Sequence, residues 1–159
     1  MEKTLVSAVV ITYKQEQYIK QTLDSVFAQD YDNLEIVITD DNSPDSTFSI
    51  IQEYVRDYTG PHKVIINQNV PNLGIAGNVN KGVALSHGEV ICLFDGDDIS
   101  LPNRVSKSVK LMQENGVEGG TLNMEYINKD SCSTGFYVEP IGDVTKIFGI
   151  KDYLSDNYI

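Results

Sequence analysis

Short runs of β-branched and apolar residues alternate with amphipathic segments along most of this chain. The runs are bounded by turn residues and predict buried strands over 5–12, 34–39, 63–68 and 89–94. The segments between them carry apolar residues at helical spacing and predict helices over 15–29, 46–58, 75–86 and 102–115. A fifth strand is expected around 120–127 and a short helix around 151–155. This alternation predicts an α/β sandwich with a mostly parallel central sheet.

Acidic residues directly follow two of the predicted strands. Asp40 and Asp41 come after the second strand, and Asp95-Gly96-Asp97 comes after the fourth. Right-handed crossovers place the carboxyl ends of parallel strands at one edge of the sheet, where open α/β sheets bind their ligands. Thr12, Asp41 and Asp95 are therefore expected at the same edge. Taken alone, the Asp40-Asp41 pair fits a metal site, a reader of a planar base or a helix-capping turn.

The Asp95-Gly96-Asp97 segment offers two carboxylates on alternate residues. Such hard oxygen ligands bind Mg²⁺ or Mn²⁺, usually together with substrate phosphates, and the alternative is a solvated acidic turn. The whole chain carries 23 acidic against 12 basic residues, a net charge of -11. Nucleic acid is a poor partner for such a surface. A diphosphate can bind an acidic pocket only if a cation intervenes.

The remaining polar candidates are weaker when each is taken alone. Tyr13 follows the first strand, where an aromatic ring can stack on a base or simply cover the core. Asn72 lies in a polar loop, for which ordinary turn chemistry is the simpler interpretation. His62 and His87 are expected to be surface residues without partners. Neither a Gly-Lys-Ser/Thr phosphate loop nor a Gly-x-Gly-x-x-Gly segment occurs, which argues against common nucleotide hydrolases and dehydrogenases.

Cysteine usage and hydropathy favour a cytoplasmic protein. Cys92 and Cys132 show no metal-ligand spacing, and Cys92 is expected to be a small buried hydrophobe. The sequence shows neither a signal peptide nor an apolar run of membrane-spanning length. Association with the inner face of a membrane would depend on segments outside this sequence.

Three blocks of sequence occur in a specific order and spacing over roughly the first two-thirds of the chain. They are VVITYK at 9–14, IVITDDNSPDST at 36–47, and a series from Asn72-Leu73-Gly74 through Asn80 and Asp95-Gly96-Asp97-Asp98 to Pro102. Together they resemble the nucleotide-sugar domain of family 2 glycosyltransferases. This resemblance implies the GT-A fold, a Rossmann-like three-layer sandwich.

The resemblance also implies a role for each matching position. Tyr13 would stack on the base of the donor, expected to be uracil, with Thr12 beside it. Asp41 would accept a hydrogen bond from the base imide, and Asn72 would add a polar contact.

The same resemblance assigns the metal and phosphate chemistry. Asp95 would support the ribose or a metal-bound water, and Asp97 would ligate Mn²⁺ or Mg²⁺, which would stabilise the departing nucleoside diphosphate. Family members often carry Arg where Val79 stands, and Lys81 is a candidate to supply that positive charge.

The implied protein is a metal-dependent transferase that moves a sugar from a UDP-sugar to a saccharide or lipid-linked acceptor with inversion, in surface polysaccharide synthesis. Residues 1–127 would form the nucleotide-sugar-binding core. Residues 128–159 would begin an acceptor-side region that continues beyond this sequence and contains the catalytic base. One alternative is a nucleotide-sugar-binding module without catalysis, and a distant one is a phospho-receiver domain. An exposed sheet edge would also allow two copies to pair.

Overall fold

The computed structural model describes residues 4–121, 125–127 and 133–136. The chain divides into two units, Met1–Leu111 and Met112–Ile159. The first unit contains the strands β1 (Val6–Thr12), β2 (Leu34–Asp40), β3 (Lys63–Gln68) and β4 (Val90–Asp95). Its helices are α1 (Ile19–Phe27), α2 (Thr47–Arg56), α3 (Gly74–Leu85) and the start of α4 (Arg104–Asn115).

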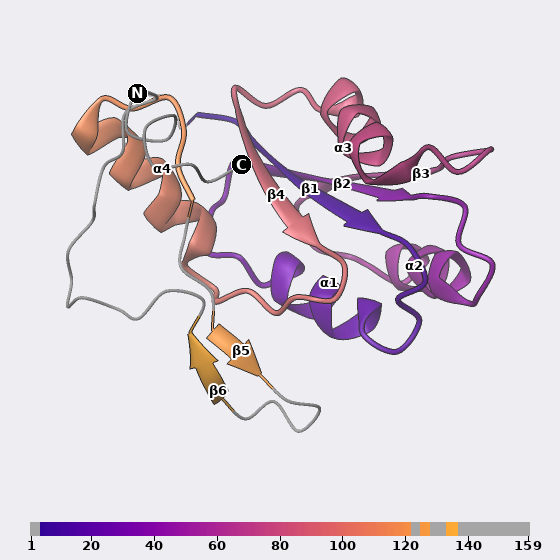
Figure 1. The fold of residues 1–159 in the computed structure, drawn as a ribbon. Helices are drawn as coiled ribbons and strands as arrows, with labels where there is room; N and C mark the ends of the chain where they lie inside the picture. The colour runs from indigo at the N-terminus through magenta and orange to yellow at the C-terminus, as the bar shows by residue number, and fades with distance from the viewer. Residues whose placement is uncertain (1–3, 122–124, 128–132, 137–159) are drawn as a thin grey trace, which may run out of the picture. The chain divides into compact units, whose positions relative to one another are not determined.

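The four strands form one parallel sheet in the order β3-β2-β1-β4 (Figure 1). Thr12 at the end of β1 is in register with Asp40 of β2, and Ile11 is in register with Asp95 of β4. The predicted α/β architecture is therefore confirmed, with strand bounds within one residue of those expected. A phospho-receiver is the wrong alternative, because that fold places β1 between β2 and β3, whereas here β1 lies between β2 and β4.

Helices cover both faces of the sheet, with α3 on one face and α1 and α2 on the other (Figure 1). Because side chains alternate along a strand, one set of β1 and β2 residues joins a core with α1, α2 and α4. That set is Val6, Ala8, Val10, Leu34, Ile36 and Ile38, all of them buried. Val9 faces α3 instead, and a Cβ at Gly82 of α3 would lie 2.4 Å from Val9 Cγ1. Gly82 thus lets α3 approach the sheet closely.

Helix α1 begins four residues later than the sequence predicts. Lys14 has a positive φ of 57°, and the backbone N–H of Gln15 donates to Thr47 Oγ1 at 2.8 Å. Residues 15–18 form a turn, which the Tyr18 N–H closes by donating to the Gln15 carbonyl at 2.9 Å. The polar segment after β1 therefore stays at the edge of the sheet as a loop.

The strand expected around 120–127 is shorter and belongs to a different sheet. Strand β5 (Glu125–Ile127) pairs antiparallel with β6 (Ser133–Phe136) in the second unit. The helix expected at 151–155 falls outside the described residues. Among the helices that are described, none is long and apolar enough to cross a bilayer.

A buried carboxylate, Glu35, organises the amino-terminal end of the sheet. Its side chain accepts hydrogen bonds from Ser7 Oγ at 2.6 Å and from the His87 backbone N–H. His87 Nδ1 lies 3.2 Å and Lys63 Nζ 3.7 Å from Glu35 Oε2. The expectation that His87 lacks a partner is therefore wrong, because a carboxylate 52 residues away in sequence holds it.

We expect the Glu35→Gln variant to flatten the dependence of stability on pH. Burial alone would raise the pKa of the Glu35 carboxyl, but the hydrogen bonds from Ser7 and His87, together with the charge of His87, lower that pKa overall. A lowered pKa in the folded state gives stability that is present above the unfolded pKa of about 4.3 and is lost as the pH falls through the folded value. Urea unfolding at pH 7 should show a free energy of unfolding about 1–3 kcal/mol lower in the variant than in the wild type. At pH 4 the difference between the two proteins should be smaller. Equal pH slopes for both proteins would contradict this assignment.

Candidate functional site

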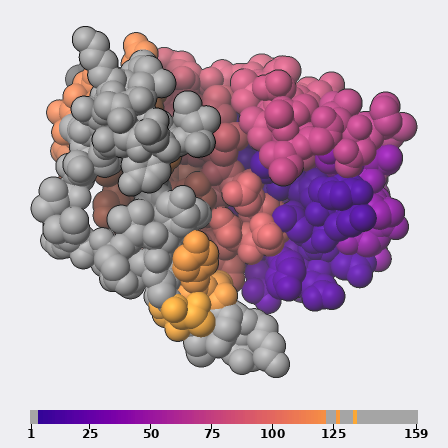
Figure 2. All heavy atoms as spheres, viewed as in Figure 1, coloured from indigo at the N-terminus to yellow at the C-terminus, as the bar shows by residue number. Residues whose placement is uncertain are grey.

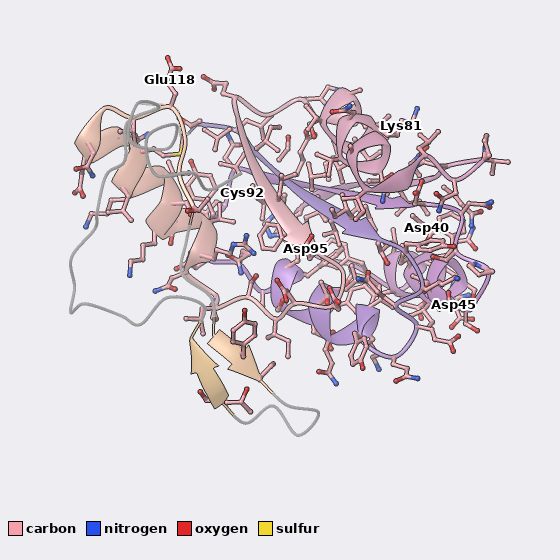
Figure 3. The ribbon with its side chains drawn as sticks, in the orientation of Figure 1. Asp40, Asp45, Lys81, Cys92, Asp95 and Glu118 are labelled. Atoms are coloured by element: carbon pink, nitrogen blue, oxygen red, sulfur yellow. The ribbon has the colours of Figure 1, made fainter. Side chains whose placement is uncertain are left out.

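The exits of β1, β2 and β4 meet at the carboxyl edge of the sheet. The Asp41 N–H donates to the Thr12 carbonyl and the Gly96 N–H donates to the Ile11 carbonyl, both at 2.9 Å. Figure 3 shows Asp40 and Asp95 at the ends of β2 and β4, and Figure 2 shows atoms from the exits of β1 and β4 side by side on one face. The predicted convergence of Thr12, Asp41 and Asp95 on this edge is confirmed by the topology.

Asp40 and Asp41 are neighbours in sequence but have different surroundings. Asp40 is fully buried, and its carboxylate accepts hydrogen bonds from the Ser43 N–H at 2.9 Å, from Ser43 Oγ, and from Gln68 Nε2 at 3.1 Å. Both of its oxygens are therefore used to hold the turn after β2 and the end of β3. Of the interpretations open for the pair, the turn is the one that fits Asp40.

Asp41 is 3% exposed and keeps one carboxylate oxygen uncommitted. Its Oδ1 accepts from the Leu73 N–H at 2.8 Å and from Asn69 Nδ2 at 3.0 Å. No hydrogen bond reaches its Oδ2 from the part of the chain that the structure describes. Since a carboxylate oxygen accepts about two hydrogen bonds, Oδ1 is saturated and Oδ2 is the oxygen left for a ligand.

Asn72 secures the loop over Asp41. Its Nδ2 donates to the Asp41 carbonyl at 2.6 Å, and its Oδ1 accepts from the Gly74 N–H at 3.0 Å. The side chain thus uses both ends of its amide within the chain, and Nδ2 retains one further hydrogen to donate.

The β1 exit presents an aromatic ring beside an unpaired hydroxyl. Tyr13 is 42% exposed, and Lys14 Nζ lies 5.1 Å from the centre of its ring. Thr12 is buried, and its Oγ1 has no hydrogen-bond partner within the described ranges. A Cβ at Gly96 would lie 2.8 Å from Thr12 Cβ and 2.1 Å from Gln15 Oε1. Only glycine therefore lets the β4 exit lie this close to Thr12.

The β4 exit concentrates negative charge. Asp95, Asp97 and Asp98 are all exposed. The pKa of Asp98 is raised by partial desolvation of its carboxylate and by the charges of Asp95 and Asp97. Arg104, which the sequence did not single out, donates to the Leu93 carbonyl at 2.6 Å and to Ser100 Oγ at 2.9 Å. It also stacks 4.2 Å from the centre of the Phe94 ring.

These carboxylates fit a divalent cation that a substrate helps to hold. No group of three or more His, Cys, Asp or Glu side chains in the described segments could hold a metal ion by itself. Magnesium-type sites commonly use one or two carboxylates and complete their shell with substrate phosphates and water. The exposed, like-charged oxygens of Asp95 and Asp97 match that donor set.

Two residues of α3, Lys81 and Asn78, bear on the site. Lys81 lies on α3 and Asp95 at the end of β4 (Figure 3), and no ion pair joins Lys81 to either acidic cluster within 4–121. Asn78, which sequence reasoning missed, is 3% exposed and accepts from Asn69 Nδ2 at 2.8 Å. The signal that could have revealed it is a polar side chain one turn before Gly82, on the helix face directed at the sheet.

Comparison with known proteins identifies glycosyltransferases as relatives of this chain. The sequence profile of the family described as glycosyl transferase family 2 matches residues 7–139. An uncharacterized glycosyltransferase of Haemophilus influenzae is 34% identical, over 98% of this chain and 54% of its own length. A UDP-Glc:alpha-D-GlcNAc-diphosphoundecaprenol beta-1,3-glucosyltransferase of Escherichia coli is 32% identical, over 86% of this chain and 52% of its own. The chain thus spans about half the length of these curated relatives.

Solved structures share the fold. S. aureus TarS 1-349 in complex with UDP-GlcNAc aligns with a TM-score of 0.61 and 26% identity, over 74% of this chain and 36% of its own. A mannosyltransferase from Pyrobaculum calidifontis in complex with GDP-Man and Mn²⁺ aligns with a TM-score of 0.65 and 24% identity, over 70% of this chain and 33% of its own. The latter likeness supports the fold alone, and the two together confirm the expected GT-A architecture.

Proposed function

The chain belongs to glycosyltransferase family 2, and we propose that it forms the donor-binding part of a transferase that uses a UDP-sugar and Mn²⁺ or Mg²⁺. The observation that carries this proposal is Oδ2 of Asp41, which accepts no hydrogen bond from the described residues while Oδ1 accepts two. Support also comes from S. aureus TarS, whose structure contains UDP-GlcNAc, and from the Escherichia coli relative, which is named for a UDP-Glc donor.

Asp41 suits a base that offers one donor rather than two. Uracil presents a single imide N–H on its pairing edge, which one carboxylate oxygen can accept. Guanine presents an N–H and an amino group side by side, which would engage both oxygens of a carboxylate. Because Oδ1 of Asp41 already accepts two hydrogen bonds from the protein, uracil is the better match. Tyr13 would stack on the ring, and Thr12 Oγ1 supplies an unpaired polar atom beside it.

The phosphates would lie at the β4 exit. Asp97 and Asp95 would hold Mn²⁺ or Mg²⁺, which when bound neutralises the charge that develops on the departing diphosphate. Without a cation, Asp95, Asp97 and Asp98 would repel the diphosphate. The carboxylates therefore give the site its dependence on metal.

Transfer itself needs an acceptor and a base. We assign residues 1–127 to the donor core and 128–159 to the start of the acceptor side, with the base beyond the present sequence. The acceptor would be a saccharide or a lipid-linked sugar, as the name of the Escherichia coli relative indicates for that protein, and transfer would invert the anomeric carbon. We place the reaction in surface polysaccharide synthesis, at the inner face of the membrane. Pairing of two copies along an exposed sheet edge stays a prediction.

A panel of nucleotides tests the choice of base. Isothermal calorimetry with Mn²⁺ should show that UDP binds about tenfold more tightly than GDP. This is the contribution of one charge-assisted hydrogen bond, here from the imide N–H of uracil to Asp41. Tighter binding of GDP would refute the uracil assignment while leaving the metal site standing.

A binding module without catalysis is the second candidate, because the chain spans about half the length of its relatives. Release of UDP from UDP-sugars, measured for this chain and for a longer form that includes the acceptor side, separates the two. Turnover only in the longer form would assign donor binding to this chain and catalysis to the whole protein.

The Lys81→Ala variant is expected to weaken UDP binding by about threefold, because the charge of a half-buried lysine that still contacts solvent contributes less than about 1 kcal/mol. The loss should shrink as salt is raised, since screening weakens the attraction to the phosphates. Lys20→Ala, which removes an exposed lysine from α1, is the matched control. Unchanged UDP affinity in Lys81→Ala at low salt would remove Lys81 from the site.

A further inference from the structure

A buried polar network lies directly behind Asp41. Asn69 Nδ2 donates to both Asp41 Oδ1 at 3.0 Å and Asn78 Oδ1 at 2.8 Å. Asn69 and Asn78 are buried, and both donate their side-chain amide hydrogens within the chain, so neither has a hydrogen left to donate to a ligand. Asn67 Nδ2 donates in turn to Asn69 Oδ1 at 2.8 Å, which fixes the orientation of the Asn69 amide.

Asn78 connects this network to the ends of two strands. Its Nδ2 donates to the Thr39 carbonyl at 3.1 Å and to the Thr12 carbonyl at 3.4 Å. Its Oδ1 accepts from Thr39 Oγ1 at 2.7 Å as well as from Asn69. The amide thus uses both hydrogens and both lone pairs, the full hydrogen-bonding capacity of the side chain. One residue therefore ties together the β1 exit beside Tyr13 and the carboxylate of Asp41.

This arrangement is unusual for the buried face of a helix. Positions that face a sheet are normally apolar, and a buried amide destabilises the fold unless all of its groups are paired. The close approach of α3 at Gly82 brings Asn78, one turn earlier, within reach of the strand ends. A fully paired network of this kind restricts its members to one geometry.

We propose that Asn78 and Asn69 are positioning residues that set base recognition without touching the nucleotide. Asn69 holds Oδ1 of Asp41, so that Oδ2 is presented to the base, and Asn78 fixes Asn69 together with the end of β1. This inference rests on the proposed function, in which Asp41 accepts the imide N–H. It predicts that the network contributes to the affinity for the base and not to the affinity for the metal-bound diphosphate, which lies at the β4 exit.

The test compares a ligand with a base and a ligand without one. Calorimetry with Mn²⁺ gives the dissociation constants of UDP and inorganic pyrophosphate for the wild type, Asn78→Ala and Asn69→Ala. UDP should bind about tenfold more weakly to each variant, the cost of a misdirected hydrogen bond to a charged group, and pyrophosphate within about twofold of the wild type. Val83→Ala, at an exposed position of the same helix, should leave both constants unchanged.

A gentler variant covers the case in which Asn78→Ala does not fold. Thr39→Val keeps the shape of a fully buried side chain but removes the hydroxyl that donates to Asn78 Oδ1. It should weaken UDP binding about threefold, again without affecting pyrophosphate.

The outcomes separate this inference from the proposed function. Equal losses for UDP and pyrophosphate, or no loss of UDP affinity in Asn78→Ala and Asn69→Ala, would overturn the positioning role. By contrast, a wild type that binds UDP no better than pyrophosphate, or an Asp41→Asn variant with unchanged UDP affinity, would overturn base recognition by Asp41 itself.

Discussion

Replacing Asp97 by alanine is expected to abolish metal-dependent binding of UDP, with a loss of affinity of about 100-fold or more. Mutating a residue that only supports a metal ligand already costs about 10–100-fold in metal affinity, and removing a ligand should cost at least as much. Asp95 would remain as the single carboxylate of the pair and would hold the cation weakly, so the repulsion between the diphosphate and the remaining carboxylates would not be neutralised. The measurement is a calorimetric titration with UDP at saturating Mn²⁺. Without Mn²⁺, both the variant and the wild type should bind UDP poorly.

Stability separates this effect from damage to the fold. Asp97 is exposed, and its charge contributes to the raised pKa of Asp98, so its removal should leave the free energy of unfolding unchanged or slightly higher. Asp57→Ala is the matched control, since it removes an exposed carboxylate at the end of α2, away from the carboxyl edge of the sheet. Wild-type affinity for UDP and Mn²⁺ in Asp97→Ala would exclude Asp97 as a metal ligand.

The Asp41→Ala variant should lose both base recognition and stability. The lost hydrogen bond to the imide predicts UDP binding weaker by about 10- to 100-fold. Removal of the carboxylate also leaves the Leu73 N–H and one hydrogen of the Asn69 amide without their acceptor, which should lower the free energy of unfolding by about 1–3 kcal/mol. Calorimetry and urea denaturation measure the two effects separately.

Asp41→Asn distinguishes charge from packing. The asparagine can still present an oxygen to the Leu73 N–H. The free energy of unfolding of Asp41→Asn should therefore be higher than that of Asp41→Ala and close to that of the wild type, while its affinity for UDP stays low. Pyrophosphate should bind both variants like the wild type, because it engages only the metal at the β4 exit. A parallel fall in pyrophosphate affinity would show that the Asp41 variants disturb the whole edge, and the base assignment would then fail.

The parallel sheet and the residues at its carboxyl edge could be predicted from the sequence because both follow from local patterns. Runs such as Ala8 to Val10 and Ile36 to Ile38 are buried on both faces of the sheet, and their continuous apolar sequence therefore predicts strands. Once strand and helix alternate, the handedness of the crossovers places Thr12, Asp41 and Asp95 together. The blocks around these residues then indicate the family.

The start of α1 and the contacts of the individual polar side chains depend on partners that are distant in sequence. Thr47, 32 residues away, accepts from the Gln15 N–H in the segment predicted to be helical. Asp40 and Asp41 look alike in sequence. Only contacts with Ser43 and Gln68 show that Asp40 holds a turn, and only contacts with Asn69 and Leu73 show which oxygen of Asp41 is already used. Asn78 and His87 likewise acquire their roles from side chains 39 and 52 residues away. No periodicity or propensity reports such contacts.

The most direct test of the donor site is a calorimetric titration of the wild-type chain with UDP, with and without Mn²⁺. The account predicts saturable binding with one UDP per chain in the presence of Mn²⁺ and a large loss of affinity when the metal is chelated. Binding of equal strength with and without metal would contradict the role of the Asp95 and Asp97 carboxylates. No binding in either condition, by a protein shown to be folded, would contradict the donor site itself.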